Sequence, residues 1–468
     1  MKLATERPNI IFILADDLGY GDIGGVNGGL TRTPHLDRLM GESLSFEHQY
    51  AASPVCNPSR ASLLTGRYPH RTGSIDTLEW RGLERLALDE ITLADSLGAA
   101  GYRTAHIGKW HLGAFDSRYA PRSRGFDESV CFKGGGHDYF DWRIEYNDVP
   151  VNSDGRYLTD VWTAEAVSFL ERQSVAQPFY LNLCYNAPHT PLQVPDDEAQ
   201  IFRDTGLFTE DVCLLYGMIS RLDHGVGVVL DALEKLGLQE NTVVVFTSDN
   251  GPEFMSDYLT RPTHTERFNC NLRGSKGSVY EGGIRVPLMV RWPAGILGGM
   301  SVGFMAHFTD WFTTLLSLAG TDIPRDRVID GVDLVPAGTV IPPSDVENYR
   351  PKTPLLARQR VAELQRHRDR DFTDSWENLR AVHGDRLPAA PVNVLPVNIQ
   401  PKNELVGRVV FDPSNAGASD QADNDMLPSP PCHLPRMQHA AASMSRRGRG
   451  WRADDSDAFL LHPLQPES

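Results

Sequence analysis

The sequence predicts an α/β protein in which a large mixed, mostly parallel sheet is sandwiched by helices. Four apolar runs of strand length, rich in Ile, Val, Phe and Tyr, alternate along the chain with helical patterns. A run that is apolar at nearly every position is typical of a strand covered on both faces, as in the centre of a parallel sheet. The four runs are residues 9–15, 102–107, 179–185 and 242–247.

Two helices are expected between these runs. In residues 209–236 apolar side chains recur at spacings of three and four, and Gly237 is a typical residue to end a helix. The pair Thr33-Pro34 opens an earlier helix, because proline fits the first helical position.

The length of 468 residues allows one large core and a smaller domain or tail. We assign residues 1–340 to the α/β domain and residues 341–468 to an atypical C-terminal region. This region holds 15 of the 32 prolines and, apart from short stretches near residues 356–366 and 405–411, lacks helical or strand periodicity. We therefore expect it to be poorly ordered, or to be the remnant of a small second domain.

Composition excludes several classes of function. A net charge of -16 argues against nucleic acid as a partner, although it leaves room for a small anionic substrate in a locally positive pocket. The six cysteines are scattered without a C-x-x-C pair, so neither a disulfide framework nor a zinc site is expected. No apolar run in the sequence reaches the roughly 18–20 residues of a membrane span. As it stands, the sequence shows no signal peptide, which predicts a cytoplasmic protein, or a periplasmic or secreted one if the true start lies upstream.

Polar side chains follow each of the four apolar runs. In open α/β sheets, ligands bind beyond the carboxyl ends of the strands, so these side chains are expected to converge on one crevice. They are Asp16 and Asp17 after the first run, Lys109 and His111 after the second, His189 after the third, and Asp249 and Asn250 after the fourth.

Cys56 opens the segment Cys-Asn-Pro-Ser-Arg-Ala-Ser-Leu-Leu-Thr-Gly-Arg, which predicts a helix with Asn57 as its cap and Gly66 as its end. This places Cys56 at a helix N-terminus, where backbone N–H groups favour an anion. Arg60 lies one turn further on, and its guanidinium can point back toward Cys56. The alternative, on the residues alone, is a buried structural cysteine beside a turn.

Three Asp and one Asn among these residues offer only oxygen ligands. Such hard ligands suit Ca²⁺ or Mg²⁺. The four are Asp16, Asp17, Asp249 and Asn250. The alternative reading of the Asp pair is that it caps a helix or a turn.

The Cys56 segment resembles the signature of the formylglycine-dependent type I sulfatases, in the alkaline phosphatase superfamily. Further segments resemble the family's other motifs, in the family's order over roughly residues 8–335. They are Pro8-Asn9-Ile10-Ile11 leading to Asp16-Asp17-Leu18-Gly19-Tyr20-Gly21-Asp22, Thr33-Pro34-His35-Leu36-Asp37, Gly108-Lys109-Trp110-His111-Leu112-Gly113, Asn186-Ala187-Pro188-His189, Ser248-Asp249-Asn250-Gly251, and Arg273-Gly274-Ser275-Lys276 through Gly283.

This resemblance implies an alkaline-phosphatase-like catalytic domain and an arylsulfatase-like sulfuric ester hydrolase. Cys56 is implied to be oxidised to formylglycine by a maturation enzyme, and its hydrate to attack sulfur while one Ca²⁺ is held by Asp16, Asp17, Asp249, Asn250 and residue 56. The substrate is implied to be a sulfated carbohydrate or an aryl sulfate.

The resemblance also implies roles for the remaining polar residues. Arg60 and Lys109 hold the hydrate and its charge, and His111 is the base for sulfate elimination. His189 and Lys276 assist the departing oxygen. On the residues alone, each histidine could be structural and each lysine a surface cation. His137 is a weaker candidate for substrate contact.

Other histidines and one aspartate are interpreted as structural. His106 faces the strand, and Asp223 and His224 lie in the middle of a helix.

Two departures from the family leave alternatives open. The segment expected in the family's small C-terminal domain is not recognisable, and the signal peptide common among exported relatives is not seen. The competing readings are a phosphodiesterase or phosphonate hydrolase of the same superfamily, and a non-catalytic relic with a broken C-terminus.

Overall fold

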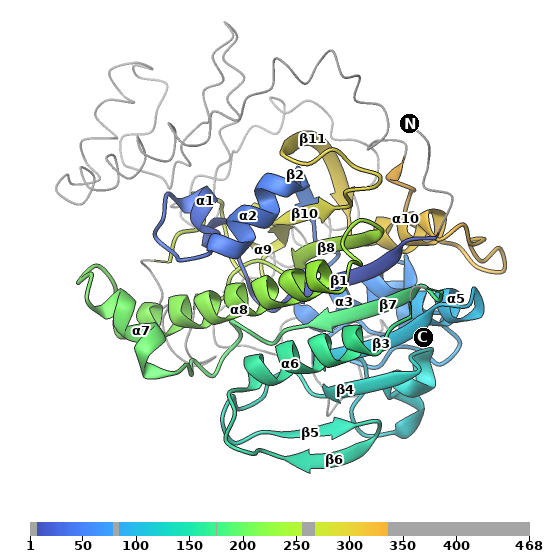
Figure 1. The fold of residues 1–468 in the computed structure, drawn as a ribbon, viewed down its shortest axis with the longest axis horizontal. Coiled ribbons are helices and arrows are strands. Elements are labelled where there is room, and N and C mark those ends of the chain that lie inside the picture. Colours follow the sequence, from blue (N-terminus) through green and yellow to red (C-terminus); the bar gives the residue numbers. More distant parts are fainter. Residues whose placement is uncertain (1–6, 78–83, 175, 255–266, 336–468) are drawn as a thin grey trace, which may run out of the picture. The chain divides into compact units, whose positions relative to one another are not determined.

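The computed structural model describes residues 7–77, 84–174, 176–254 and 267–335. The C-terminal region predicted for residues 341–468, including the helix and strand expected there, lies outside the described residues. In the described part, eleven strands form one mixed sheet, in the order β11-β2-β10-β8-β1-β7-β3-β4-β5-β6 with β9 paired to β2 (Figure 1).

The strands are β1 (Asn9–Ala15), β2 (Leu44–Tyr50), β3 (Arg103–Lys109), β4 (Glu128–Phe132), β5 (Arg143–Tyr146), β6 (Val149–Asn152), β7 (Phe179–Cys184), β8 (Thr242–Ser248), β9 (Arg285–Val286), β10 (Leu288–Arg291) and β11 (Met300–His307). The five strands β8, β1, β7, β3 and β4 run parallel to one another, and antiparallel pairs flank them on both sides. The four apolar runs supply four of these central strands, which confirms the predicted parallel centre.

The helices of seven residues or more are α2 (Pro34–Glu42), α3 (Cys56–Thr65), α5 (Leu93–Ala99), α6 (Leu158–Glu171), α7 (Asp196–Arg203), α8 (Glu210–Lys235) and α10 (Asp310–Leu318). Single turns are formed by α1 (Gly24–Asn27), α4 (Pro69–Thr72) and α9 (Glu281–Ile284). Both predicted helices are present as α2 and α8.

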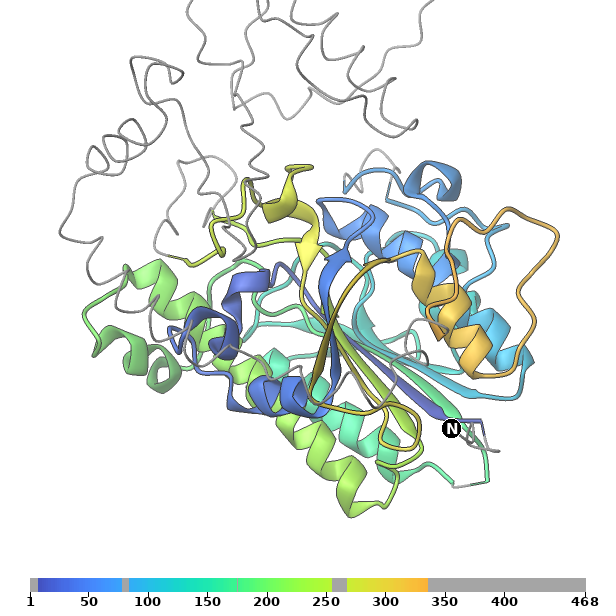
Figure 2. The ribbon, with the colours of Figure 1, turned by 90° about the horizontal axis from the view of Figure 1, so that it is seen from above.

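Two layers of helices cover the two faces of the sheet (Figure 2). Along β1, Ile11 and Ile13 belong to the core that includes α6 and α8, whereas Phe12 and Leu14 belong to the core that includes α3, α5 and α10. This alternation follows from the period of two in a strand, and it explains why β1 is apolar at every position after Asn9.

The helix α8 is the one described helix that is long and apolar enough to cross a membrane. Most of its apolar stretch, 72%, is buried inside the domain, where it packs against α2, α6 and α7. A long and largely apolar helix is equally typical of a protein core, and the packing identifies α8 as a core helix.

Candidate active site

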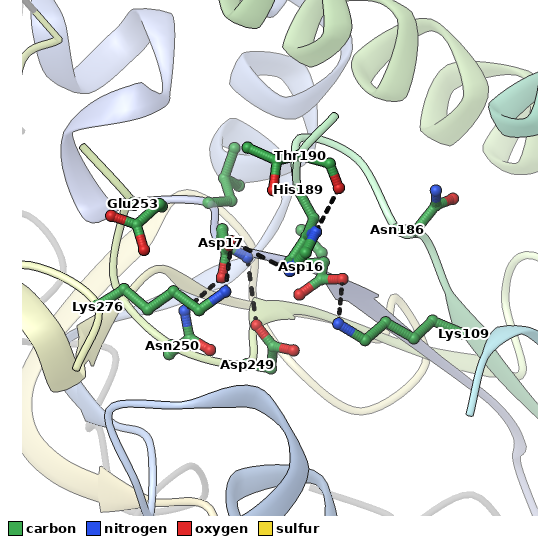
Figure 3. A network of polar contacts seen from close by, with 12 residues as sticks. Asp16, Asp17, Lys109, Asn186, His189, Thr190, Asp249, Asn250, Glu253 and Lys276 are labelled. Carbon is green, nitrogen blue, oxygen red and sulfur yellow. Dashed lines mark hydrogen bonds and ion pairs between the residues drawn. The ribbon is translucent and has the colours of Figure 1, made fainter. Parts of the chain in front are cut away.

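The polar residues that follow the central strands meet at one edge of the sheet, as the sequence predicts. Asp16 and Asp17 leave the end of β1, His189 follows β7, and Asp249 follows β8 (Figure 3). Lys109 is the last residue of β3 rather than a residue beyond it. Because these strands are parallel neighbours, their carboxyl ends place the side chains in one buried cluster.

Cys56 is the first residue of α3 and is 3% exposed. The prediction that Asn57 caps this helix is wrong, because the helix begins one residue earlier, with Val55 in the capping position. Asn57 is buried in the first turn, where its amide donates to the carbonyl oxygens of Glu84 and His111. Asn57 therefore ties the Cys56 helix to the segment that carries His111. The helix ends as predicted at Gly66, whose φ is 68°.

Three carboxylates of the cluster are matched by three buried cations. Lys109 Nζ lies 2.6 Å from Asp16 Oδ2, and both side chains are 0% exposed. Arg60 Nε and Nη2 lie 2.8 and 2.7 Å from Asp249 Oδ2.

The third pair joins the loop after β1 to a more distant loop. Lys276 Nζ donates to Asp17 Oδ2 at 2.8 Å (Figure 3). Buried charges without partners are costly, so this pairing is what allows six ionisable groups to lie together in the interior.

The cluster fits a hard divalent cation. Asp16 Oδ1 and Asn250 Oδ1 are buried oxygens without a hydrogen-bond partner among the described residues. Asp16, Cys56 and Asp249 each offer a ligand atom, and these atoms lie within 4.8 Å of one another. A second group of the same kind consists of Asp16, Asp17 and His189. Unpartnered buried oxygens are rare in proteins, and oxygen donors at this spacing are suited to Ca²⁺ or Mg²⁺.

The carboxylates crowd one another enough to perturb their protonation. Burial and the negative charge of Asp16 raise the pKa of Asp249 to about 6, although Arg60 opposes the rise. For Asp17, burial raises the pKa, but Lys276 and His189 outweigh it and hold the pKa below its ordinary value. A divalent cation among these oxygens would favour the ionised form of all three carboxylates.

The two predicted histidines are buried and differ in what holds them. His189 Nδ1 lies 2.6 Å from the carbonyl oxygen of Thr190, so this nitrogen carries the proton and donates it (Figure 3). Nε2 of His189 is left facing the carboxylates, 3.8 Å from Asp17 Oδ2.

His111 has no hydrogen-bond partner at either ring nitrogen among the described residues. Burial, followed by the positive charges of Lys109 and Arg60, lowers its pKa well below the ordinary value. For His189, burial and the positive charge of Lys276 lower the pKa to about 3. Both imidazoles are therefore neutral at pH 7, so each has a nitrogen that can accept a proton.

One buried arginine beside the site was not predicted. Both Arg267 and Asp22 are fully buried, and Arg267 Nε lies 3.0 Å from Asp22 Oδ1. Arg267 also donates to the carbonyl oxygen of Asp17 at 2.7 Å and to that of Glu253 at 2.7 Å. It thereby fixes the backbone of Asp17, whose φ of 66° is in the left-handed region. Asp22 lies in the Asp-rich motif, but nothing near Arg267 in the sequence indicates its partner 245 positions away.

The other candidates have structural partners. His137, in the loop between β4 and β5, accepts a hydrogen bond at Nε2 from the backbone N–H of Arg143, the first residue of β5. His106 lies 3.0 Å from the Asn182 amide inside the sheet. Asp223 accepts the backbone N–H groups of residues 35 and 36, which confirms its structural interpretation.

Comparison with known proteins agrees with this geometry. The Sulfatase family model matches residues 8–321. N-acetylgalactosamine-6-sulfatase of Mus musculus is 37% identical over 71% of this chain and 66% of its own length, and that of Homo sapiens is 34% identical over 81% and 74%. Steryl-sulfatase of Mus musculus is 33% identical over 71% of this chain and 65% of its own length.

Solved structures show the same fold. The crystal structure of Ps i-CgsB in complex with k-i-k-neocarrahexaose has a TM-score of 0.65 and 35% identity, over 71% of this chain and 76% of that one. A phosphonate monoester hydrolase of Agrobacterium radiobacter has a TM-score of 0.52 and 21% identity, over 74% and 79%, which supports the shared fold alone. The chain spans about two thirds to three quarters of the length of the N-acetylgalactosamine-6-sulfatases that it matches. The family model and these relatives together show that the chain belongs to the sulfatase family.

Proposed function

We propose that this protein hydrolyses the sulfate ester of a sulfated carbohydrate or an aryl sulfate, using formylglycine at position 56 and one bound Ca²⁺. The observation that carries the proposal is the position of Cys56. It is buried at the N-terminus of α3, and its thiol, Asp16 and Asp249 have ligand atoms within 4.8 Å of one another. A simple structural cysteine has no need of three carboxylates and three cations around it.

The thiol itself is a poor nucleophile in this environment. Burial raises the pKa of Cys56, although Lys109 and Lys276 oppose the rise. A protonated thiol does not attack sulfur. Conversion to formylglycine, as in the family, replaces the thiol with an aldehyde whose hydrate presents two hydroxyl groups. This requires a formylglycine-generating or sulfatase-maturating enzyme as a partner.

Asp16, Asp249 and Asn250, together with Asp17, are the residues that would hold Ca²⁺. The bound ion supplies positive charge to the sulfuryl oxygens, which are otherwise opposed by three carboxylates. Arg60, Lys109 and Lys276 pair with Asp249, Asp16 and Asp17 and balance the three negative charges of the cluster.

The two imidazoles suit opposite proton transfers, His111 as a neutral acceptor and His189 as a donor once it has gained a proton. His111 is buried and unprotonated, so it can accept a proton from a hydroxyl of residue 56 during release of sulfate. His189 presents Nε2 beside Lys276, on the side where a leaving oxygen gains a proton. An anionic substrate brings negative charge next to His189, which favours the protonated imidazole that this step requires.

A carbohydrate sulfate is favoured over other esters by the relatives. The chain is about 35% identical to a protein crystallised with a neocarrahexaose and to enzymes named for N-acetylgalactosamine 6-sulfate. Both names refer to a sugar. Steryl-sulfatases match at a similar identity of 33–34%, so the solved structure with a bound oligosaccharide is what favours the carbohydrate class.

The test is to express the chain with a formylglycine-generating enzyme and to measure the mass of the peptide that contains residue 56. Turnover of an aryl sulfate and of sulfated galactose oligosaccharides is then compared with that of an aryl phosphodiester and an aryl phosphonate. We expect the aldehyde at position 56, sulfate release that chelator stops and Ca²⁺ restores, and no sulfate release by the Cys56→Ala variant. Preferential turnover of the phosphorus esters would contradict the proposal and identify a phosphonate hydrolase or phosphodiesterase. A folded, aldehyde-bearing protein without turnover of any ester would identify a non-catalytic relic.

A further inference from the structure

The loop that joins β4 to β5 lies against both histidines of the site. A Cβ atom built on Gly135 falls 2.9 Å from Cε1 and 3.1 Å from Nε2 of His111. A Cβ atom built on Gly136 falls 3.3 Å from Cε1 of His189. Neither glycine has a positive φ, so the backbone conformation is open to any residue. At Gly135 the space for a side chain is taken by the His111 ring, and at Gly136 it is restricted by the His189 ring and, at 3.6 Å, by the carbonyl oxygen of Thr190.

The two rings depend on this loop to different degrees. His111 lacks hydrogen bonds at both ring nitrogens within the described residues, so packing sets the orientation of its ring. His189 is also held by its hydrogen bond to Thr190 (Figure 3). The contact with Gly135 is therefore expected to matter more to His111 than the contact with Gly136 does to His189.

The loop is itself anchored to the segment that carries His189. The hydroxyl of Tyr139, which is fully buried, is shared between the carbonyl oxygens of Asn186 at 2.6 Å and His189 at 2.8 Å. The backbone N–H of Tyr139 donates to the Gln193 side chain at 2.9 Å, and the amide of Gln193 donates in turn to Asp138 at 2.8 Å. The part of the loop that follows the two glycines is thus hydrogen-bonded to the segment that carries His189.

We propose that Gly135 and Gly136, held in place by Tyr139, form a positioning element that sets the orientation of the His111 and His189 imidazoles. The inference rests on the proposed function, in which His111 acts on the hydroxyl of residue 56 and His189 acts on the leaving oxygen. Gly135 leaves room for one orientation of the His111 ring, and an added methyl group would displace that ring. Small displacements of a proton-transferring group cost large factors in rate, on the order of 100-fold per ångström.

The first test compares Gly135→Ala with Gly303→Ala, whose added methyl group meets nothing within 4 Å. We expect Gly135→Ala to lower kcat for aryl sulfates with good leaving groups by about 10- to 100-fold and to lower KM in parallel, so that kcat/KM is unchanged, because sulfate release follows the step in which residue 56 becomes sulfated. The loss should be largest for good leaving groups, for which sulfate release limits turnover, and smaller for poor ones, since His111 acts on sulfate release. Gly303→Ala should keep the kcat of the unsubstituted protein. Unchanged kcat in folded Gly135→Ala would overturn the proposal.

The second test separates His189 from His111. Gly136→Ala and Tyr139→Phe should reduce kcat by about 3- to 10-fold for aryl sulfates with poor leaving groups and leave good leaving groups unaffected, because only the former need proton donation. A loss that does not depend on the leaving group in both variants would overturn the assignment to His189. If Gly135→Ala does not fold, these two variants still test whether the loop positions a histidine of the site.

The Ca²⁺-induced rise in Tm serves as a readout of the metal site, and it should be unchanged in all the loop variants. Loss of that rise in parallel with kcat would show a general structural role and refute positioning. An unsubstituted protein that releases no sulfate would instead refute the proposed function.

Discussion

Replacing Lys109 with methionine should destabilise the protein strongly without Ca²⁺ and only weakly with it. Lys109 Nζ lies 2.6 Å from Asp16 Oδ2, and both groups are 0% exposed. Methionine has similar length but no charge, so the variant leaves the buried Asp16 carboxylate without its hydrogen-bonded cation, and only Arg60 Nη2, at 3.8 Å from Asp16 Oδ1, remains near it. Removing one member of a buried ion pair costs about 3–5 kcal/mol. This corresponds to a fall in Tm of roughly 6–10 °C, at roughly 2 °C per kcal/mol for a large domain.

Bound Ca²⁺ changes this cost because it brings positive charge to the same carboxylates. With the ion in place we expect Lys109→Met to cost only about 1–2 kcal/mol. The thermodynamic cycle then requires that the variant bind Ca²⁺ more tightly than the unsubstituted protein, by at least roughly fivefold. Catalysis should still be lost, because Lys109 also faces residue 56.

The assay is calorimetric unfolding in chelator and in saturating Ca²⁺, together with titration of the ion into the metal-free protein. The control is Arg118→Met, which removes an exposed cation 2.6 Å from Asp116, a carboxylate outside the cluster. An exposed pair contributes about 0–1 kcal/mol, so this control should change Tm little and equally in both conditions. Equal destabilisation of Lys109→Met with and without Ca²⁺, or weaker binding of the ion, would refute the reasoning.

Three further predictions follow from other buried groups. Asp249→Ala should abolish both the Ca²⁺-induced rise in Tm and the sulfatase activity. The control Asp326→Ala, at the surface, should preserve both. A rise in Tm that persists in Asp249→Ala would show that Asp249 is not a metal ligand. Arg267→Lys should weaken Ca²⁺ binding by about 10- to 100-fold in isothermal titration, because lysine cannot bind the Asp22 carboxylate and the Asp17 carbonyl oxygen at the same time. An unchanged affinity would contradict the role of Arg267 in fixing the Asp17 backbone. Burial raises the pKa of Asp223 to about 7, so this carboxyl group binds its proton more tightly in the folded state than in the unfolded state. The free energy of unfolding should therefore fall as the pH rises from about 4 to about 7, by up to about 1.4 kcal/mol per pH unit. Asp223→Asn should flatten that part of the curve of unfolding free energy against pH, and an unchanged slope would refute the assignment.

The centre of the fold could be predicted because its signals are local. The strands β1, β7 and β8 are buried on both faces, so each appears as a continuous apolar run with bounds within one residue of the structure. Parallel pairing then sends the residues after each strand to one edge, which is why Asp16, His189 and Asp249 could be placed together before any coordinates were considered.

The remaining features depend on contacts between distant parts of the chain. The flanking strands β9 and β10 are two and four residues long and pair antiparallel, and such short segments carry no clear periodicity. Asp22 and Arg267 meet across 245 positions, and Gly135 is needed for the space taken by His111 rather than for a turn. In each of these cases the cause is a neighbour in space that the adjacent sequence does not indicate.

The position of β1 has a consequence for how the domain responds to heat. This strand lies between β7 and β8, contributes alternate side chains to the cores on both faces, and ends in Asp16 and Asp17. Melting either helical layer would expose one side of β1 and release the carboxylates at its end. The described domain is therefore expected to have no stable half-folded form that still catalyses, so residual turnover after a heat pulse should report the folded fraction directly.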